Sequence, residues 1–541
     1  MLLRRGFLIP FMGFLLLLSA EGVQGQTEKQ AAQAGRERRI IVNWDEECLF
    51  RPIFKNRMVS KPDAQFTRRM LEDLIDEHAA VHVDTVVQCV FGAGFRSHVP
   101  SSKMTDLLED RLRLPELDAA GLDLVQILLD RCRKHGIEFV AGLRMNDRHG
   151  LPMSRFMREH PEWRLKGLGA EAMDYSYEEV RDHVLAFTRE TLDAYDVDGI
   201  EFDYMRWCHM FPPGRGQQQA HLLTDFTRKA RTLLDESANR RRRGRLALGV
   251  RVPQTLEECE FLGFDVATWV KEGLVDWVVP ADFFFPDFNM KTEQFVKLTE
   301  GTDCKVYPSI MPLSCWKGNA RTINLNHYRA AAQNFYAFGA AGLSPYNYQV
   351  HWQRRRHTSR GPWADPLMWP AALGYLRELR DPKEIAKGDR HYLFYALWQD
   401  RNSETGFPMN HRIVLDRGNP KAAGSQRFRV AEDLSDPNLR ATLQFKAVGL
   451  GDDENLDIRL NDAPVPGEYT TRIFDKDGQS ELEGVKLPAF HLFAVDLNWP
   501  APKPPVIHGD NQLKVRLIRK EGKGQGTVVI DELEFYVYVR N

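Results

Sequence analysis

Residues 197–207 read Val-Asp-Gly-Ile-Glu-Phe-Asp-Tyr-Met-Arg-Trp, a short apolar run that holds two carboxylates, Glu201 and Asp203. Side chains two residues apart on a strand point to the same side, with Cα atoms about 6.6 Å apart. The run lacks the regular alternation of a half-exposed strand, which is typical of a strand buried on both faces. It therefore predicts a buried parallel strand with acidic groups near its carboxyl end.

Seven similar apolar runs flank this one, and amphipathic helical patterns separate them. Eight strand–helix units over about 340 residues predict an α/β fold, a (β/α)₈ TIM barrel with enlarged loops. A doubly wound open sheet is the alternative, but no glycine-rich nucleotide loop follows the first strand. The eight runs are residues 40–44, 85–91, 138–143, 199–202, 246–252, 277–280, 306–310 and 343–346. The main helical patterns are residues 66–78, 122–135, 178–195, 222–239, 266–272, 293–299, 328–338 and 366–379.

The pattern changes after Asp381. Residues 414–541 contain short alternating runs between turns rich in Gly, Asp, Asn and Pro, which predict a small all-β domain of jelly-roll or sandwich type. We therefore expect a barrel over residues 39–380, a connecting segment over 381–413 and the all-β domain over 414–541.

The first residues have the features of a signal peptide. Arg4 and Arg5 precede an apolar run, residues 7–18, and small residues follow up to Gly25. We expect cleavage after residues 1–25 and an exported, periplasmic or extracellular protein without stable membrane insertion; an uncleaved anchor is the alternative. The formal net charge of -2 gives no reason to expect nucleic acid or an anionic membrane as a partner.

Reactive side chains of a (β/α)₈ barrel lie at the carboxyl ends of its strands. On strand four, Glu201 is expected to lie deeper and Asp203 nearer the mouth. Because an unpaired buried charge is costly, Arg251 or Arg144 is expected to neutralise Glu201. A purely structural ion-pair cluster is the alternative. The remaining rim residues expected to bind substrate are Trp44, Asp147, Arg206, Trp207, Tyr346 and Asn347.

Residues 198–206 resemble the Asp-Gly-(apolar)-x-(apolar)-Asp strand of many barrel glycoside hydrolases. His-Pro-Glu-Trp at 160–163, the stretches 174–181 and 275–280, and Gly-Val-Arg-Val-Pro at 249–253 resemble the bacterial glycosyl-hydrolase-like barrels, a family related in name to family 10. The resemblance covers residues 39–380. It implies a glycoside hydrolase that needs no cofactor and no metal, acts on a polysaccharide or oligosaccharide, and uses Asp203 as nucleophile.

Glycoside hydrolysis needs a second carboxyl group. Asp282, after strand six, matches the acid/base position of some related barrels, although Pro-Ala-Asp-Phe at 280–283 departs from the Pro-Gln-x-Tyr expected in the family. If Ala281 and Phe283 face inward, Asp282 faces away and is structural. Asp147 and Glu47 are the rivals for this role.

Two other functions stay open. A non-catalytic surface protein could bind polysaccharide in the barrel cleft, and a metal-dependent hydrolase could gather ligands at the mouth, although the two-histidine strand motif of most metal barrels is missing. The possible metal ligands are Asp45, Asp147, His149, Asp203 and Asp282.

The last domain resembles the galactose-binding-like domains found beside many glycanases, with residues 511–517 and 528–534 expected as its last hairpin.

Overall fold

The structure is a computed structural model, and it describes most of the chain after residue 38. The predicted signal peptide lies outside the described residues. The described ranges are 39–44, 67–92, 95–97, 121–146, 153–166, 172–205, 207–282, 286–311, 323–348, 371–394, 406–408, 412–475, 481–482, 485–486, 490–500, 503–519 and 525–540.

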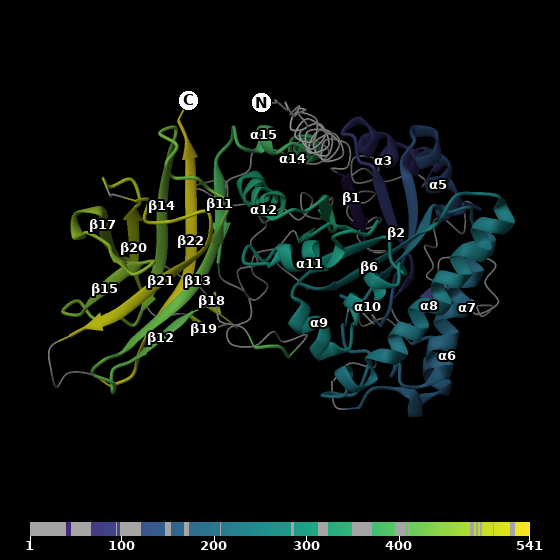
Figure 1. Cartoon of the computed structure of the whole chain (residues 1–541), viewed down its shortest axis with the longest axis horizontal. Helices are drawn as coiled ribbons and strands as arrows, with labels where there is room; N and C mark the ends of the chain where they lie inside the picture. The colour runs from purple at the N-terminus through teal and green to yellow at the C-terminus, as the bar shows by residue number, and fades with distance from the viewer. Residues whose placement is uncertain are drawn as a thin grey trace, which may run out of the picture. The chain divides into compact units, whose positions relative to one another are not determined.

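A sheet of parallel strands forms the first part of the chain (Figure 1). Its strand order is β8-β7-β6-β5-β4-β2-β1-β10-β9, and the short strand β3 pairs antiparallel to β2. Each predicted apolar run coincides with a strand or, in one case, with a pair of short strands. The bounds are β1 Arg39–Trp44, β2 Thr85–Gly92, β3 Arg96–Ser97, β4 Glu138–Arg144, β5 Gly199–Asp203, β6 Ala247–Pro253, β7 Trp277–Ala281, β8 Lys305–Val306, β9 Ser309–Ile310 and β10 Gly342–Pro345.

The seventh predicted run closes the sheet. Pro308, which has no N–H to donate, separates β8 from β9. β8 pairs with β7, and β9 pairs with β10. The carbonyl oxygen of Val306 also accepts a hydrogen bond from Ala341 N at 3.0 Å, just before β10. The two short strands therefore connect β7 to β10, and β10 pairs with β1. This arrangement confirms the prediction of a TIM-barrel-like α/β fold.

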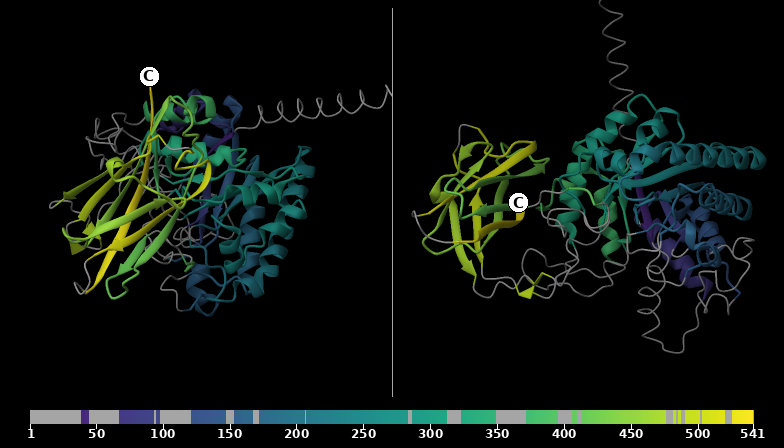
Figure 2. Two further views of the ribbon diagram at one scale, coloured as in Figure 1. Left: turned by 60° about the vertical axis from the view of Figure 1, so that its left-hand side comes forward. Right: turned by 90° about the horizontal axis from the view of Figure 1, so that it is seen from below.

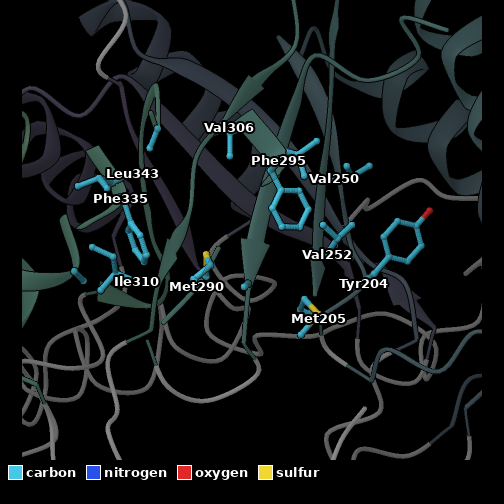
Figure 3. Close-up of a cluster of buried hydrophobic side chains, with 14 of the residues drawn as sticks. Tyr204, Met205, Val250, Val252, Met290, Phe295, Val306, Ile310, Phe335 and Leu343 are labelled. Carbon is cyan, nitrogen blue, oxygen red and sulfur yellow. The ribbon is translucent and has the colours of Figure 1, made fainter. Parts of the chain in front are cut away.

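Helices cover the outer face of the parallel sheet (Figures 1 and 2). Figure 3 shows how they pack: Phe295 of α11 and Phe335 of α12 lie among the side chains of Val250, Val306 and Leu343. Burial of these large apolar side chains holds the helices on the strands. The helix bounds are α3 Arg68–Ala80, α5 Leu124–His135, α6 Arg155–Glu159, α7 Glu178–Ala194, α8 Gly216–Arg241, α9 Leu256–Leu262, α10 Val266–Lys271, α11 Thr292–Thr299, α12 Leu325–Ala337, α14 Gly374–Leu379 and α15 Pro382–Ile385, with short 3₁₀ helices at Pro161–Trp163, Ala371–Leu373 and Gly467–Tyr469.

Antiparallel sheets follow, separate from the parallel sheet (Figure 2). One has the order β11-β22-β14-β20-β17, with β12 also paired to β22, and another has the order β13-β21-β15-β16; β18 and β19 form a small pair. The bounds are β11 Arg390–Leu393, β12 Ile413–Asp416, β13 Ala423–Val430, β14 Leu439–Val448, β15 Asn455–Leu460, β16 Ala463–Pro464, β17 Thr470–Asp475, β18 Glu481–Leu482, β19 Val485–Lys486, β20 Phe490–Asp496, β21 Gly509–Ile518 and β22 Thr527–Val539.

One expectation for this part is wrong. Residues 511–517 and 528–534 do not form a hairpin, because β21 pairs with β13 and β15 whereas β22 belongs to the other sheet. The segment 381–413 contains α15 and the strand β11, which pairs with β22. All four residues of β11 are buried, so the strand lacks the alternation that marks a half-exposed strand.

Polar contacts join the parallel and antiparallel parts. Arg429 of β13 binds both carboxylate oxygens of Glu293 in α11, at 2.5 and 2.8 Å. The Asn334 amide of α12 donates to the carbonyl oxygen of Arg429 at 2.9 Å. Residues 39–541 form one compact unit. Among the described residues, no helix combines the length and the apolar character needed to span a membrane.

Candidate active site

Glu201 points into the barrel. Its strand, β5, lies between β4 and β6, yet its carboxylate is bound from β1 and β7, which are not neighbours of β5. Asn43 Nδ2 donates to Oε1 at 2.6 Å, and Trp277 Nε1 donates to Oε2 at 2.9 Å. Contacts from strands across the sheet are possible only through the interior. By strand parity, Asp203 faces the same side.

Glycine makes room for the indole that reaches Glu201. Gly249 on β6 lies beside Glu201 in the sheet register. A Cβ on Gly249 would lie 2.1 Å from Nε1 of Trp277, so no larger residue fits there without moving the indole. β6 therefore has a glycine, Gly249, at the position where the Trp277 ring extends toward Glu201.

The environment of Glu201 opposes its ionisation. The side chain is fully buried, and its described partners are an amide and an indole, both uncharged. Burial raises its pKa from 4.5 to about 7, and the nearby charge of Asp203 acts in the same direction. The hydrogen bond from Trp277, the charge of Arg251 and the hydrogen bond from Asn43 lower this pKa in part. Near neutral pH the carboxyl group is thus poised between its two forms.

Asp203 has the cation that Glu201 lacks. Its Oδ1 accepts from Arg251 Nη1 at 3.0 Å and from the backbone N–H of Met205 at 2.9 Å. Both Asp203 and Arg251 are buried, with 2% and 0% of their surface exposed. Within the described part of the chain, no hydrogen bond holds Oδ2. One carboxylate oxygen is fixed, and the other remains available to a bound molecule.

Arg251 also organises the residues around Asp203. Its Nη2 lies 3.3 Å from the carbonyl oxygen of Asp282 and 3.3 Å from Met311 Sδ. The guanidinium carbon sits 4.2 Å from the centre of the Tyr346 ring, a cation–π contact. Arg144 Nη2 donates to the Tyr346 hydroxyl at 3.3 Å. Arg251 therefore contacts three of the predicted site residues, Asp203, Asp282 and Tyr346.

Several expectations about individual residues need correction. Arg251 neutralises Asp203 rather than Glu201, because the two residues are register partners on neighbouring strands. Trp44 is not at the rim: it is fully buried, and its ring meets His78 of α3 edge-on at 4.8 Å. Since Asn43 points inward, strand alternation turns Trp44 toward the helices.

The remaining predicted residues fall into two groups. Trp207 and Asn347 are described; both have left-handed backbone conformations, with φ of 67° and 48°, and Asn347 N donates to Asn43 O at 2.8 Å. The others, Asp147 and Arg206, lie outside the described residues, as do Asp45, Glu47 and His149.

Asn43, Trp277 and Asn146 are site residues that the sequence analysis missed. Asn43 is an isolated polar residue in an apolar run, a signal that could have been used. Asn146 follows β4 and connects loops: its amide donates to Met173 O and His209 O at 2.9 and 2.8 Å, and its Oδ1 accepts from Met173 N at 2.8 Å. Only the folded chain brings these segments together.

Two further features concern metal binding and cavities. Within the described ranges, no group of three or more His, Cys, Asp or Glu side chains is arranged to hold a metal. A cavity of about 430 Å³ lies at the opposite end of the barrel, where β1 and β4 begin. That end stabilises barrels rather than catalysing reactions. The cavity is lined by Arg39, Ala79, His82, Val83, Asp84, His135, Gly136, Ile137, Glu138 and Arg380.

No protein-family model and no curated protein matches the chain. Among solved structures it is similar to the glycoside hydrolase domain of PgaB (BpsB) from Bordetella bronchiseptica, with TM-score 0.40, 14% identity, and coverage of 63% of this chain and 99% of that one. It is also similar to an alpha-amylase from Geobacillus thermoleovorans, with TM-score 0.39, 11% identity, and coverage of 90% and 99%.

A third similar structure is the galactosidase domain of alpha-galactosidase-sucrose kinase, AgaSK, with TM-score 0.35 and 14% identity. The match covers 89% of this chain, which spans about half of that structure, 55%. Likenesses this distant carry no conclusion about the activity or substrate of the present chain. The parallel sheet and its outer helices define the fold.

Proposed function

We propose that the chain is an exported glycoside hydrolase of the bacterial glycosyl-hydrolase-like group, acting on a polysaccharide or oligosaccharide. The observation that carries this proposal is the state of Asp203. Arg251 and the Met205 N–H hold Oδ1, while Oδ2 has no hydrogen bond within the described residues. A nucleophile or a stabiliser of a cationic transition state needs this combination of fixed orientation and one available oxygen.

In the proposed reaction, Asp203 attacks the anomeric carbon or stabilises the positive charge that develops there. A second carboxyl group donates a proton to the departing oxygen. Asp282 stays the proposed donor because of its place after β7, with Asp147 and Glu47 as the rivals; its backbone carbonyl oxygen lies 3.3 Å from the guanidinium that binds Asp203. Arg144 and Tyr346, joined through the tyrosine hydroxyl, are proposed to bind substrate at the mouth. Trp207, Asn347, Asp147 and Arg206 are proposed to bind substrate in the loops beside them.

A screen of the purified protein against neutral, acidic and sulfated polysaccharides tests the proposal, with release of reducing ends as the readout. Turnover of at least one glycan, abolished by Asp203→Asn, is expected. Turnover that survives this substitution would remove Asp203 from the mechanism. Absence of turnover across the panel would remove the enzyme proposal.

A non-catalytic polysaccharide-binding protein is the second candidate. The buried, largely uncharged surroundings of Glu201 favour it, because they leave Asp203 as the inward carboxylate that has a cationic partner. Glycan binding that depends on Asp203, measured by calorimetry without any turnover, would establish this function instead. The proposed galactose-binding-like domain at residues 414–541 is tested by the same titration, carried out with galactose and related sugars.

Export is part of the proposal and has its own test. Residues 1–25 are proposed to be removed, so that the mature chain begins near Gln26. N-terminal sequencing of the protein recovered from the periplasm or the medium checks this. Intact residues 1–20 on the soluble protein would contradict cleavage.

A further inference from the structure

Glu201 and Asp203 lie on one strand and face the barrel interior, yet their carboxylates have different hydrogen-bond partners. Asp203 receives a guanidinium and a backbone N–H. Glu201 receives an amide and an indole. Two nitrogens of the Arg251 guanidinium have partners: Nη1 donates to Asp203, and Nη2 lies 3.3 Å from both the Asp282 carbonyl oxygen and the Met311 sulfur. Its Nε is buried and has no hydrogen-bond partner among the described residues. Two buried carboxylates that share one cation, Arg251, cannot both ionise without a large free-energy cost.

We propose that burial keeps Glu201 as a carboxylic acid beneath Asp203, and that Trp277 and Asn43 are positioning residues that orient its carboxyl group and set the pH at which it loses its proton. While Glu201 is protonated, Asp203 alone pairs with Arg251. Loss of the Glu201 proton then acts as a switch on this site. The effect on catalysis rests on the proposed function, whereas the protonation of Glu201 does not.

The groups that face Glu201 support this assignment. On its own strand the charged neighbour is Asp203, and on β6 it is Arg251. β1 and β7 present Asn43 and Trp277. The phenol of Tyr307, after β8, packs with Trp277 in the apolar cluster inside the barrel. On β4, Arg144 directs its Nη2 to the Tyr346 hydroxyl.

Trp277 is placed to orient as well as to donate. The indole fills the space that Gly249 leaves empty, and it packs in an apolar cluster with Ile41, Val140 and Val279. A ring held in this way keeps its N–H aimed at Oε2. Because an N–H donor stabilises a carboxylate more than a carboxylic acid, the pair of donors sets the pH at which Glu201 loses its proton.

The protonation state can be measured without any substrate. Infrared difference spectra of the full-length protein, recorded as a pH titration, follow the carbonyl stretch of protonated carboxyl groups. Ordinary Asp and Glu side chains titrate near pH 4, so a carboxyl group that titrates near neutral pH stands apart. We expect one such signal in the wild type with a midpoint near the Glu201 pKa of about 7, and its loss in Glu201→Gln.

Trp277→Phe keeps an aromatic ring and removes the N–H. The midpoint should then rise by about one pH unit, since a donor to the charged form is lost. Trp269→Phe is the matched control, because Trp269 is also buried and its N–H donates to Thr224 Oγ1 at 3.0 Å, away from Glu201. It should leave the midpoint unchanged. If Trp277→Phe does not fold, Asn43→Ala serves the same purpose and should also raise the midpoint.

Three results would overturn the inference: a spectrum unchanged by Glu201→Gln, a carboxyl group that titrates with ordinary surface acids, or an unchanged midpoint in a folded Trp277→Phe protein. The link to activity is tested on any glycan that is turned over. An ionised Glu201 competes with Asp203 for Arg251, so kcat/KM should fall as the pH rises above the midpoint. In Trp277→Phe, this fall of the pH–activity profile should shift to higher pH together with the midpoint. If the titration behaves as expected but no glycan is cleaved, the proposed function fails while the protonation of Glu201 stands.

Discussion

Asp203 and Arg251 are register partners on the neighbouring strands β5 and β6, and their side chains meet inside the barrel at 3.0 Å. Both are buried, and the attraction between their charges offsets part of the cost of removing each from water. The same arginine touches Asp282 and Tyr346. The proposed active site is therefore built around one ion pair rather than around two carboxylates of equal standing.

Asp203→Asn keeps the shape of the side chain and removes its negative charge. Turnover on an identified glycan should fall by several orders of magnitude while substrate affinity persists, because the lost interaction is made in the transition state. Steady-state kinetics together with calorimetric binding measure the two effects separately. Near-normal turnover would redirect the assignment to Glu201 or Asp147.

Asp282→Asn tests the proposed acid. Substrates with good leaving groups need no protonation as the bond breaks, so their cleavage should be spared, whereas natural glycans should be cleaved far more slowly. The comparison of aryl glycosides with natural oligosaccharides measures this difference. Equal losses on both substrates would show that Asp282 is not the acid. The separation of the two carboxyl groups in a substrate complex then distinguishes retention, at about 5 Å, from inversion, at roughly 6.5–9.5 Å.

Arg251→Met removes the cation and leaves Asp203 buried without a charged partner. The free energy of unfolding should fall by about 3–5 kcal/mol, the usual cost of breaking a buried pair from one side. Urea unfolding followed by circular dichroism gives the value. The double variant Asp203→Asn, Arg251→Met should recover part of the loss, because no buried charge remains. A double variant as unstable as Arg251→Met would mean that the arginine acts through packing against Tyr346.

Glu201 makes the stability of the protein depend on pH. In the unfolded chain its pKa is near 4.5, and in the folded protein it is about 7, so the folded state binds more protons between these values. Stability conferred by the buried acid is full below pH 4.5 and falls as pH rises to about 7, by roughly 3 kcal/mol in total. Glu201→Gln should abolish this dependence. Urea titrations of both proteins at pH 5 and pH 8 measure it, and an equal pH effect in the two proteins would contradict the prediction.

The sequence by itself determined the repeating pattern of the barrel. All eight apolar runs coincide with parallel strands, because strand formation depends on local apolar content and chain geometry. The common orientation of Glu201 and Asp203 also follows from the sequence, since alternate residues of a strand share a side. The sequence also shows that polar and charged residues follow the carboxyl ends of the predicted strands.

Tertiary structure alone decided which side chains meet. The pairing of Arg251 with Asp203 depends on the register between β5 and β6, and the contacts of Asn43 and Trp277 with Glu201 depend on closure of the sheet. The same holds for β21 and β22, whose alternating patterns suit a hairpin equally well but which belong to different sheets. Local periodicity determines which face of a strand a side chain lies on. Register and closure are properties of the whole sheet, and they determine which side chain pairs with each buried charge.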